Sequence, residues 1–363
     1  ILYRLVGSEM CIRDSVEIVR CLLQDPSLLI MDEPTSVLTP QETEQLFDVL
    51  RRFSKAGVAI LFISHKLEEI RSLTRRATVL RRGRNVGTVE SASRSSKQLA
   101  EMMVGSSVGD IDGQDAPKSE PDVLFAVRGL DRPPATPFAT PLSNLSFVAR
   151  AGEVLGIAGI AGNGQDELME ALTGEWIGAG QNVITINSRD ITRDGPSRRR
   201  QHSIGFVPEE RNGHAAVPGM SLADNALLTS HSLGEVASRG VIDSDRTRQM
   251  AAEIAGAFDV RLPQENPMAS ALSGGNLQKF VVGREISKQP SLFIVSQPTW
   301  GVDVGAALFI RRAMLELAES GSAVVMISQD LDEIFAISHR VAVLYDGQMS
   351  EQMVTADTTA ETV

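Results

Sequence analysis

Short apolar runs alternate with segments in which apolar residues recur at helical spacing. From the N-terminal side, an apolar run at residues 27–31 precedes a helical pattern at 41–54, and a second apolar run occupies 58–63. A further helical pattern at 66–74 and a strand-like segment at 77–80 follow. Apolar runs separated by helical patterns are typical of parallel strands that are buried on both faces. The predicted fold class is α/β.

The same pattern is present twice. Residues 290–294 repeat residues 26–30, and the match continues without a gap at a constant offset of 264, the difference between 290 and 26. At this offset Pro34 and Thr35 meet Pro298 and Thr299. The second copy begins near Asp122, so the offset places the start of the first copy before residue 1. We therefore expect the first copy to be a C-terminal remnant.

The repeat and the composition together predict five segments. These are a non-native leader at 1–15, the remnant of the first copy at 16–95, a linker at 96–121, the complete second copy at 122–355 and a tail at 356–363. The leader lacks the residues that the second copy has at equivalent positions. The linker is rich in Ser, Gly, Asp and Pro, as flexible connections usually are.

Composition narrows the possible partners. The chain has 363 residues, of which 42% are hydrophobic and 22% charged, with a net charge of -11. This charge disfavours a nucleic acid partner. The basic run Arg198-Arg199-Arg200 is expected to be a solvated loop or helix end. Since no apolar stretch reaches the roughly 18 to 20 residues that span a bilayer, a membrane role has to come through a partner.

Candidate catalytic residues follow two apolar runs of the first copy. Asp32 and Glu33 end the first run, and the C-terminal edge of a parallel sheet is where ligands bind. An aspartate there can hold Mg²⁺, and a neighbouring glutamate can polarise the water that attacks a γ-phosphate. His65 follows the next run and can hydrogen-bond the same phosphate. The alternatives are an acidic strand end in solvent and a structural histidine.

Two glycine-rich segments of the second copy suggest contacts with phosphate. Ser273, Gly274, Gly275 and Asn276 open a helical pattern, so that backbone N–H groups and the positive end of the helix can face a phosphate. The alternative is an ordinary Ser-Gly-Gly turn.

The other segment follows a predicted strand at 154–158 and keeps the glycine spacing of a phosphate loop. The loop comprises Gly159, Gly162, Asn163, Gly164, Gln165 and Asp166. Gln165 stands where such loops have lysine, and Asp166 where they have a Mg²⁺-binding hydroxyl. Each lost charge-assisted hydrogen bond is worth about 1.5 to 3 kcal/mol, so nucleotide binding is expected to weaken roughly tenfold or more.

Other catalytic positions of the second copy, found with the same offset, have also lost their charged residues. Ser296, Gln297 and Gln329 stand at the positions of Asp32, Glu33 and His65. The charged chemistry is missing while the surrounding sequence persists. We expect a site that has lost catalysis and kept its fold, the alternative being drift in a pseudogene.

These motifs resemble those of ATP-binding cassettes. The sequences DEPTS and ISHK around Asp32 and His65 are similar to the Walker B strand, D-loop and H-loop, and LSGGNLQK at 272–279 is similar to the signature motif. With GNGQ at 162–165 and PEER at 208–211, the chain resembles the twin-cassette ATPases of bacterial carbohydrate and nucleoside importers over residues 16–352. GNGQ with SQP favours the nucleoside subgroup.

The resemblance implies a P-loop NTPase-like cassette fold, one partial and one complete. It has a parallel core sheet with helices on both faces, a helical subdomain and an antiparallel β part. It also implies ATP and Mg²⁺ as cofactors, and two cassettes that close head to tail on ATP. Glu33, His65 and the Mg²⁺ ligand Asp32 would then act with the Ser273–Asn276 signature, supported by Asp303, while the other site would be inactive.

The implied partners are membrane permease subunits and, indirectly, a periplasmic or lipoprotein solute-binding protein, with no nucleic acid. The implied location is peripheral, on the cytoplasmic face of the inner or plasma membrane. Alone, the chain is expected to lack appreciable ATPase activity. Two alternatives stay open: a soluble twin-cassette ATPase of translation or repair, and a non-catalytic pseudo-ATPase that docks a permease. The sequence does not identify the solute.

Overall fold

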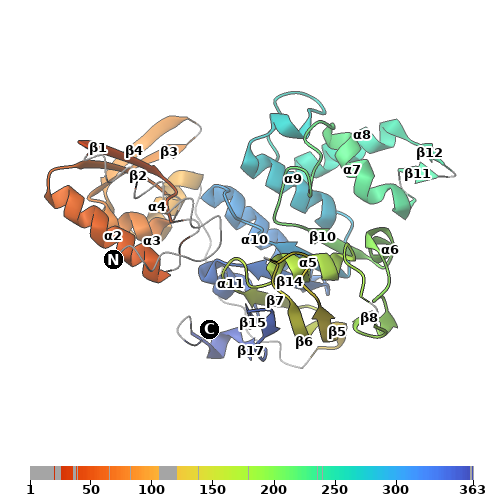
Figure 1. Cartoon of the computed structure of the whole chain (residues 1–363). Helices are drawn as coiled ribbons and strands as arrows, with labels where there is room; N and C mark the ends of the chain where they lie inside the picture. Colours follow the sequence, from red (N-terminus) through yellow and green to blue (C-terminus); the bar gives the residue numbers. More distant parts are fainter. Residues whose placement is uncertain are drawn as a thin grey trace. The chain divides into compact units, whose positions relative to one another are not determined.

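In the computed structural model the chain divides into two compact units, Ile1–Asp110 and Ile111–Val363 (Figure 1). The residues that the structure describes are 20, 26–35, 38, 40–64, 66–81, 83–105, 121–137, 139–178, 180–234, 236–238, 240–359 and 362. The leader predicted at 1–15 and most of the predicted linker lie outside them.

The first unit contains a parallel and an antiparallel pair of strands together with helices. Its described elements are β1 (Leu28–Asp32), α2 (Pro40–Lys55), β2 (Ala59–Ile63), α3 (Leu67–Leu73), β3 (Arg76–Arg81), β4 (Arg84–Glu90), the 3-10 turn η2 (Ser91–Ser93) and α4 (Ser96–Val104). Strands β1 and β2 pair in parallel with Leu28 opposite Ala59, and β3 pairs with β4 antiparallel.

One face of the β1–β2 pair is covered by α2. The apolar stripe of α2, which includes Phe47 and Leu50, packs against Leu29 and Met31 of β1. On the other face Leu28 and Ile30 are 54% and 60% exposed. The prediction that these strands are buried on both faces is therefore wrong for the first unit. In the second unit α5 and the antiparallel sheet cover the corresponding face, and the described part of the first unit has no such elements.

Helix α4 occupies the start of the predicted linker. Ser95 accepts from the backbone N–H of Gln98, whose side chain accepts in return from the N–H of Ser95, and this capping box begins the helix. Gly105 ends it in the left-handed region at φ 89°. Leu99 is 1% exposed. Residues 96–104 therefore belong to the fold of the first unit.

The second unit is built on a sheet with strand order β10-β13-β14-β7-β15-β16. In this sheet β10, β13, β14, β7 and β15 run parallel, and β17 pairs with β15. A second sheet has the order β6-β5-β8-β9. The strands are β5 (Val123–Arg132), β6 (Leu142–Arg150), β7 (Val154–Ala158), β8 (Ile184–Ile186), β9 (Arg189–Asp190), β10 (Ile204–Val207), β11 (Ala237–Ser238), β12 (Val241–Ile242), β13 (Leu292–Ser296), β14 (Ala323–Ser328), β15 (Arg340–Tyr345), β16 (Gln348–Met349) and β17 (Met353–Val354). The helices are α5 (Gln165–Thr173), α6 (Pro196–Gln201), α7 (Leu222–Ser230), α8 (Ser244–Ala257), α9 (Gly274–Ile286), α10 (Val304–Glu319) and α11 (Leu331–Ile337). Short 3-10 turns are η3 (His231–Leu233), η4 (Ala269–Ala271) and η5 (Thr355–Asp357).

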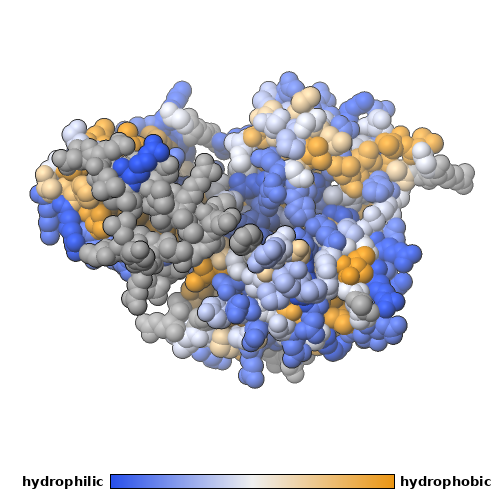
Figure 2. Space-filling view, viewed as in Figure 1, coloured by the Kyte–Doolittle hydropathy of each residue, from blue (hydrophilic) through white to orange (hydrophobic). Residues whose placement is uncertain are grey.

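Both faces of the parallel sheet are buried in this unit. Along β13, Phe293 and Val295 join a core with α7 to α11, whereas Leu292 and Ile294 join a core with α5 and the antiparallel sheet. All four side chains are fully buried. The α/β prediction, with a helical part around α7 to α9 and an antiparallel β part, is confirmed (Figure 1). Exposed apolar surface gathers around the β11–β12 hairpin, where Val241 is 71% exposed (Figure 2).

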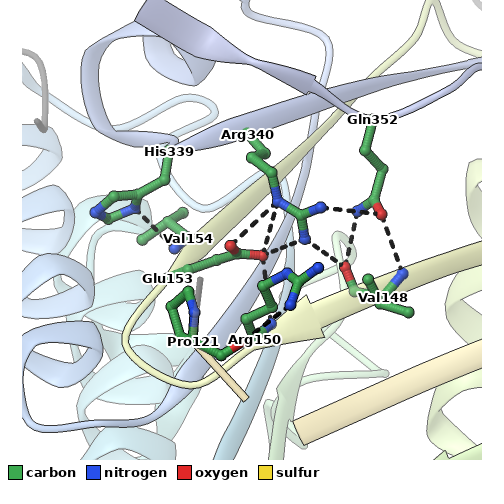
Figure 3. A network of polar contacts seen from close by, with 8 residues as sticks. All are labelled: Pro121, Val148, Arg150, Glu153, Val154, His339, Arg340 and Gln352. Carbon is green, nitrogen blue, oxygen red and sulfur yellow. Dashed lines mark hydrogen bonds and ion pairs between the residues drawn. The ribbon is translucent and has the colours of Figure 1, made fainter. Parts of the chain in front are cut away.

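A network of hydrogen bonds and ion pairs connects the two sheets of this unit (Figure 3). Glu153, 2% exposed, forms an ion pair of 2.6 Å with Arg340 at the start of β15. Arg340 also donates to the carbonyl of Val148 on β6, which accepts from Gln352 as well. Beside them Nδ1 of His339 accepts from the N–H of Val154 at 2.9 Å. The network holds the start of β7, which leads into the phosphate loop.

The sequence repeat is also a structural repeat. Helices α2 and α10, helices α3 and α11, and strands β3 and β15 have identical bounds when shifted by 264, the difference between 304 and 40. The strand register agrees too, since Leu28 faces Ala59 and Leu292 faces Ala323. The C-terminal half of the second unit thus has the same local fold as the segment from β1 to β3 of the first.

Candidate functional site

The end of β1 presents the two predicted acidic residues. Asp32 is the last residue of the strand and is exposed. Glu33 has a left-handed backbone with φ 45°, and its N–H donates to the carbonyl of Ile63 at 2.8 Å. Few residues other than glycine adopt this conformation, and when they do it is often at a functional site. The turn therefore fixes the direction of Glu33 at the edge of the sheet.

Gln297 of the second unit has the same local geometry as Glu33. Its φ is 50°, and its N–H donates to the carbonyl of Ile327 at 2.8 Å. The next turn is also repeated: Thr35 donates to Glu69 at 2.8 Å, and Thr299 donates to Glu333 at 2.6 Å. The two sites share a frame and differ in the chemistry that they present.

His65 lies outside the described residues. Gln329 is the counterpart of His65 in the second unit, and its N–H donates to Oε1 of Gln297 at 3.4 Å. Ser296, at the end of β13, is 2% exposed and Gln297 is 6% exposed. These three neutral positions lie at one edge of the sheet, as the sequence predicts, and offer no charged group.

The phosphate loop of the second unit is held together by its own glutamine. Gln165 begins α5 and is buried. Its Nε2 donates to the carbonyl of Ile160 at 2.8 Å, while its Oε1 accepts from the N–H of Asn163 at 3.0 Å. Gly159 is packed closely here, because a Cβ atom on it would lie 2.6 Å from Nε2 of Gln165. The side chain at the lysine position thus closes the loop that a phosphate would enter.

Other parts of the unit fix the same loop from outside. The side-chain oxygen of Asn163 accepts from the N–H of Asp346 at 2.9 Å, and its carbonyl accepts from the N–H of Gly347. Thr140 donates to the carbonyl of Gly162 at 2.7 Å. Gly164 has φ 106°, a backbone that strongly favours glycine.

The surroundings of the loop are acidic. Burial and the neighbouring carboxylates of Glu167 and Glu170 raise the pKa of Asp166. Burial, with a contribution from Asp166, raises the pKa of Glu209 to about 7, although Arg211 opposes the shift. Glu209 follows β10 and was not among the residues predicted for the site. Where these carboxyl groups ionise, they repel the phosphates of a nucleotide.

The signature segment forms the N-terminal end of α9. Ser273 and Gly274 are exposed, and Nδ2 of Asn276 donates to the hydroxyl of Ser273 at 2.9 Å. Asp303 caps α10 by accepting from the N–H of Ala306. A Cβ atom on Gly275 would lie 3.8 Å from Oδ2 of Asp303. The structure therefore brings Asp303 next to Gly275 of the signature segment.

Sequence reasoning missed the link between the signature helix and two loops. Gln278 accepts from Nε of Arg211 at 3.0 Å and donates to the carbonyl of Pro298 at 3.0 Å. The Arg211 guanidinium also lies 6.0 Å from the ring centroid of Trp300. The only sign of this link in the sequence was the glutamine of the LSGGNLQK motif, and the motif does not indicate which residues that glutamine contacts. This link couples the loop after β10 to α9 and to the turn before α10.

The described residues do not assemble a metal site. No group of three or more His, Cys, Asp or Glu side chains among them could hold a metal ion. In the second unit the donors at 165, 296, 297 and 329 are neutral amides or hydroxyls, a poor set for Mg²⁺. In the first unit Asp32 is a suitable oxygen ligand. At its phosphate loop the second unit can offer backbone N–H groups to a phosphate and little else.

Known proteins resemble this chain in sequence and in fold. The family described as ABC transporter matches residues 142–300. The chain is 40% identical over 347 residues to the nucleoside import ATP-binding protein NupA of Lactococcus lactis subsp. cremoris, covering 95% of this chain and 68% of NupA. It is 42% identical to the glucose import ATP-binding protein TsgD13 of Haloferax volcanii, covering 96% of this chain and 63% of TsgD13.

The fold is similar to that of an ATP-binding cassette solved as a post-hydrolysis dimer with ADP and Pi. The TM-score is 0.54 at 20% identity, and the match covers 64% of this chain and 99% of the other. The similarity to solved structures therefore concerns the cassette fold. The similarity to the curated relatives extends along nearly the whole chain, which spans about two thirds of their length.

Proposed function

Because this chain belongs to the family of ATP-binding proteins of ABC transporters, we propose that it is the ATPase subunit of an importer for a nucleoside or a simple sugar. The names of the relatives support both solute classes, since NupA is a nucleoside import protein and TsgD13 a glucose import protein. The GNGQ and SQP segments favour a nucleoside.

The contrast between Glu33 and Gln297 carries this proposal. Both residues share one strained turn, but only Glu33 can polarise a water molecule. We therefore assign general-base work to Glu33, Mg²⁺ binding to Asp32 and contact with the γ-phosphate to His65. Residues 273–276 and Asp303 are assigned to nucleotide binding. The loop at 159–166 is a weak or silent nucleotide site.

The agreement of the two units at an offset of 264 supports a twin-cassette origin, with a first cassette up to about residue 95 and a second at 122–355. The capping box of α4 supports an end of the first cassette at about residue 104 instead of 95.

The proposed partners are membrane permease subunits, with a solute-binding protein acting through them. Among the described residues no helix is long and apolar enough to cross a bilayer. Because the relative NupA is an import ATP-binding protein, the proposed location is the cytoplasmic face of the membrane, where the permease holds the chain. The neutral amides of the second unit favour one further role for that unit, namely permease docking without catalysis.

The test is ATP hydrolysis by a chimera in which a cassette half with an intact phosphate loop precedes residue 26, assembled with permease subunits of a nucleoside or sugar importer. We expect Glu33→Gln to lower kcat by at least about a hundredfold, the range typical for loss of a general base. Gln297→Ala, the matched position of the second unit, should leave kcat within about twofold. Equal effects of the two substitutions, or no effect of Glu33→Gln, would refute the assignment.

A second arm uses the chain alone. The one phosphate loop among the described residues lacks lysine, so we expect no appreciable turnover. Turnover by the isolated chain that vanished in the Glu33→Gln variant would contradict this expectation. Comparison of the two arms also separates an ATPase from a pseudo-ATPase, because a pseudo-ATPase would stay inactive in the complete assembly.

A further inference from the structure

A cavity of about 200 Å³ lies within the second unit, and none of its lining residues belongs to the phosphate loop at 159–166. Its walls come from α6, β10, α7 and α9, which are labelled in Figure 1, and from the loops that follow α5 and β10. The polar lining consists of Glu175, Arg200, His214, Thr229 and Arg284. The rest of the wall is mostly apolar. The cavity is partly open to solvent, so a small anion can reach the cationic groups in its wall.

Arg200 contributes a positive charge that is only partly satisfied. Its guanidinium carbon lies 3.8 Å from the ring centroid of Phe206. Its Nε is buried and has no hydrogen-bond partner. Within the described ranges, no carboxylate lies within ion-pair distance of this side chain. Burial lowers the pKa of Arg200 from its usual value, which reflects the cost of holding the charge here.

Two more cations stand beside Arg200 around a single carboxylate. Glu285 is fully buried, and its two oxygens accept from Arg284 and Lys288 at 2.8 Å each. These cations hold the pKa of Glu285 at about 2 in spite of its burial. Burial lowers the pKa of Lys288 to about 8. One buried carboxylate thus faces three cationic side chains.

The remaining acidic group of the wall is already paired. Both oxygens of Glu175 lie 2.9 to 3.0 Å from Nε2 of His214. Glu175 therefore offsets part of the positive potential without contacting Arg200 directly. Partly buried cations without a counter-ion are costly, and an anion that enters the cavity would relieve this cost.

We propose that this cavity binds a small oxyanion, a phosphate or a carboxylate, with Arg200 and Arg284 as its cationic partners. The planar guanidinium fork matches both oxyanions, and the Phe206 ring fixes the plane of Arg200 in advance. Within the basic run only Arg200 is available for this role. Arg198 is exposed, and Arg199 is fully engaged with backbone carbonyls.

The test measures anion binding by the full chain. Inorganic phosphate is titrated at constant ionic strength against chloride, while Tm and the heat of binding are recorded, and a second titration uses acetate. We expect phosphate to raise Tm by at least about 2 °C at saturation. If acetate acts as phosphate does, the site also accepts a carboxylate, such as an acidic side chain of a partner. If only phosphate acts, the ligand is a phosphate group.

The variant Arg200→Met keeps the apolar contact with Phe206 and removes the charge, so it should abolish the shift. Arg198→Met, on the same helix, should leave it unchanged. If Arg200→Met does not fold, Arg200→Lys replaces it and should weaken phosphate binding at least about tenfold. No shift in the unmodified chain would overturn the proposal. A shift that persists in the Arg200 variants would mean that phosphate binds elsewhere and would overturn the proposal equally.

Discussion

Nε2 of Gln165 donates to the carbonyl of Ile160 at 2.8 Å across the phosphate loop. In a phosphate loop this position carries the lysine that reaches the phosphates of a nucleotide. Here the side chain turns inward and satisfies the loop itself, with Oε1 accepting from the N–H of Asn163. The second unit has thus replaced a ligand contact by an internal one, and the loop keeps its shape without a nucleotide.

The variant Gln165→Lys should bind ATP more tightly than the unmodified chain. A lysine restores charge-assisted hydrogen bonds worth about 1.5 to 3 kcal/mol, or at least about a tenfold gain in affinity. Fluorescence titration with a labelled ATP analogue measures the change. Gln165→Ala opens the loop without adding a charge and should show no gain. Equal ATP affinities of the Lys and Ala variants would contradict the prediction, because the positive charge would then add nothing to binding.

Glu209→Gln should stabilise the second unit at alkaline pH. Burial raises the pKa of Glu209 from 4.5 to about 7, so the folded state favours the protonated acid. The contribution of this group to stability is present below pH 4.5 and is lost as pH rises through about 7. Urea unfolding at pH 8 should show a gain of up to about 3 kcal/mol that disappears near pH 4.5. Glu210→Gln, at the exposed neighbouring residue, serves as the control and should change little at either pH.

His339 should make the stability of the second unit fall in mild acid. Its Nδ1 accepts from the N–H of Val154, which requires the neutral ring, and burial lowers the pKa of the imidazole below 6.5. The stabilising contribution is therefore complete above pH 6.5 and is lost as pH falls through the lower folded-state value. In His339→Asn this part of the pH dependence should be absent from urea unfolding curves between about pH 5 and 7.5. The exposed His231→Asn variant should keep it, and a His339→Asn curve parallel to that of the unmodified chain would contradict the assignment.

Arg199→Met should destabilise the second unit far more than Arg198→Met. Arg199 is fully buried and donates to the carbonyls of Ala171, Leu172, Ile191 and Asp194. Losing these bonds leaves several buried acceptors unpaired, so we expect a loss of about 3 kcal/mol or more in the free energy of unfolding. Arg198 is exposed, and its substitution should change stability by less than about 0.5 kcal/mol. Similar losses in the two variants would mean that the buried carbonyls find other partners.

The arginine run shows where sequence reasoning failed. The run does lie at a helix end, in the last turn of α6, but only Arg198 is solvated as predicted. Arg199 is buried, with its pKa lowered to about 10 by desolvation, and Arg200 lies against Phe206. Charged residues in a short run are usually exposed. The run itself does not indicate that backbone carbonyls accept hydrogen bonds from Arg199 or that the Phe206 ring packs against Arg200. Those partners come from α5, the segment after β9 and β10.

Local features were readable from the sequence because neighbouring residues produce them. The alternation of apolar runs with helical spacing gave the strands and helices around Asp32 and Gly159, and the offset of 264 gave two copies of one fold with matching turns at Glu33 and Gln297. Contacts between distant segments had no such signal. Arg211 and Gln278 are 67 residues apart, and the inward turn of Gln165, the burial of Arg199 and the pKa of Glu209 depend equally on packing that folding alone creates. Residue type and spacing set the backbone, whereas side-chain burial and pairing were decided by which segments the sheet brings together.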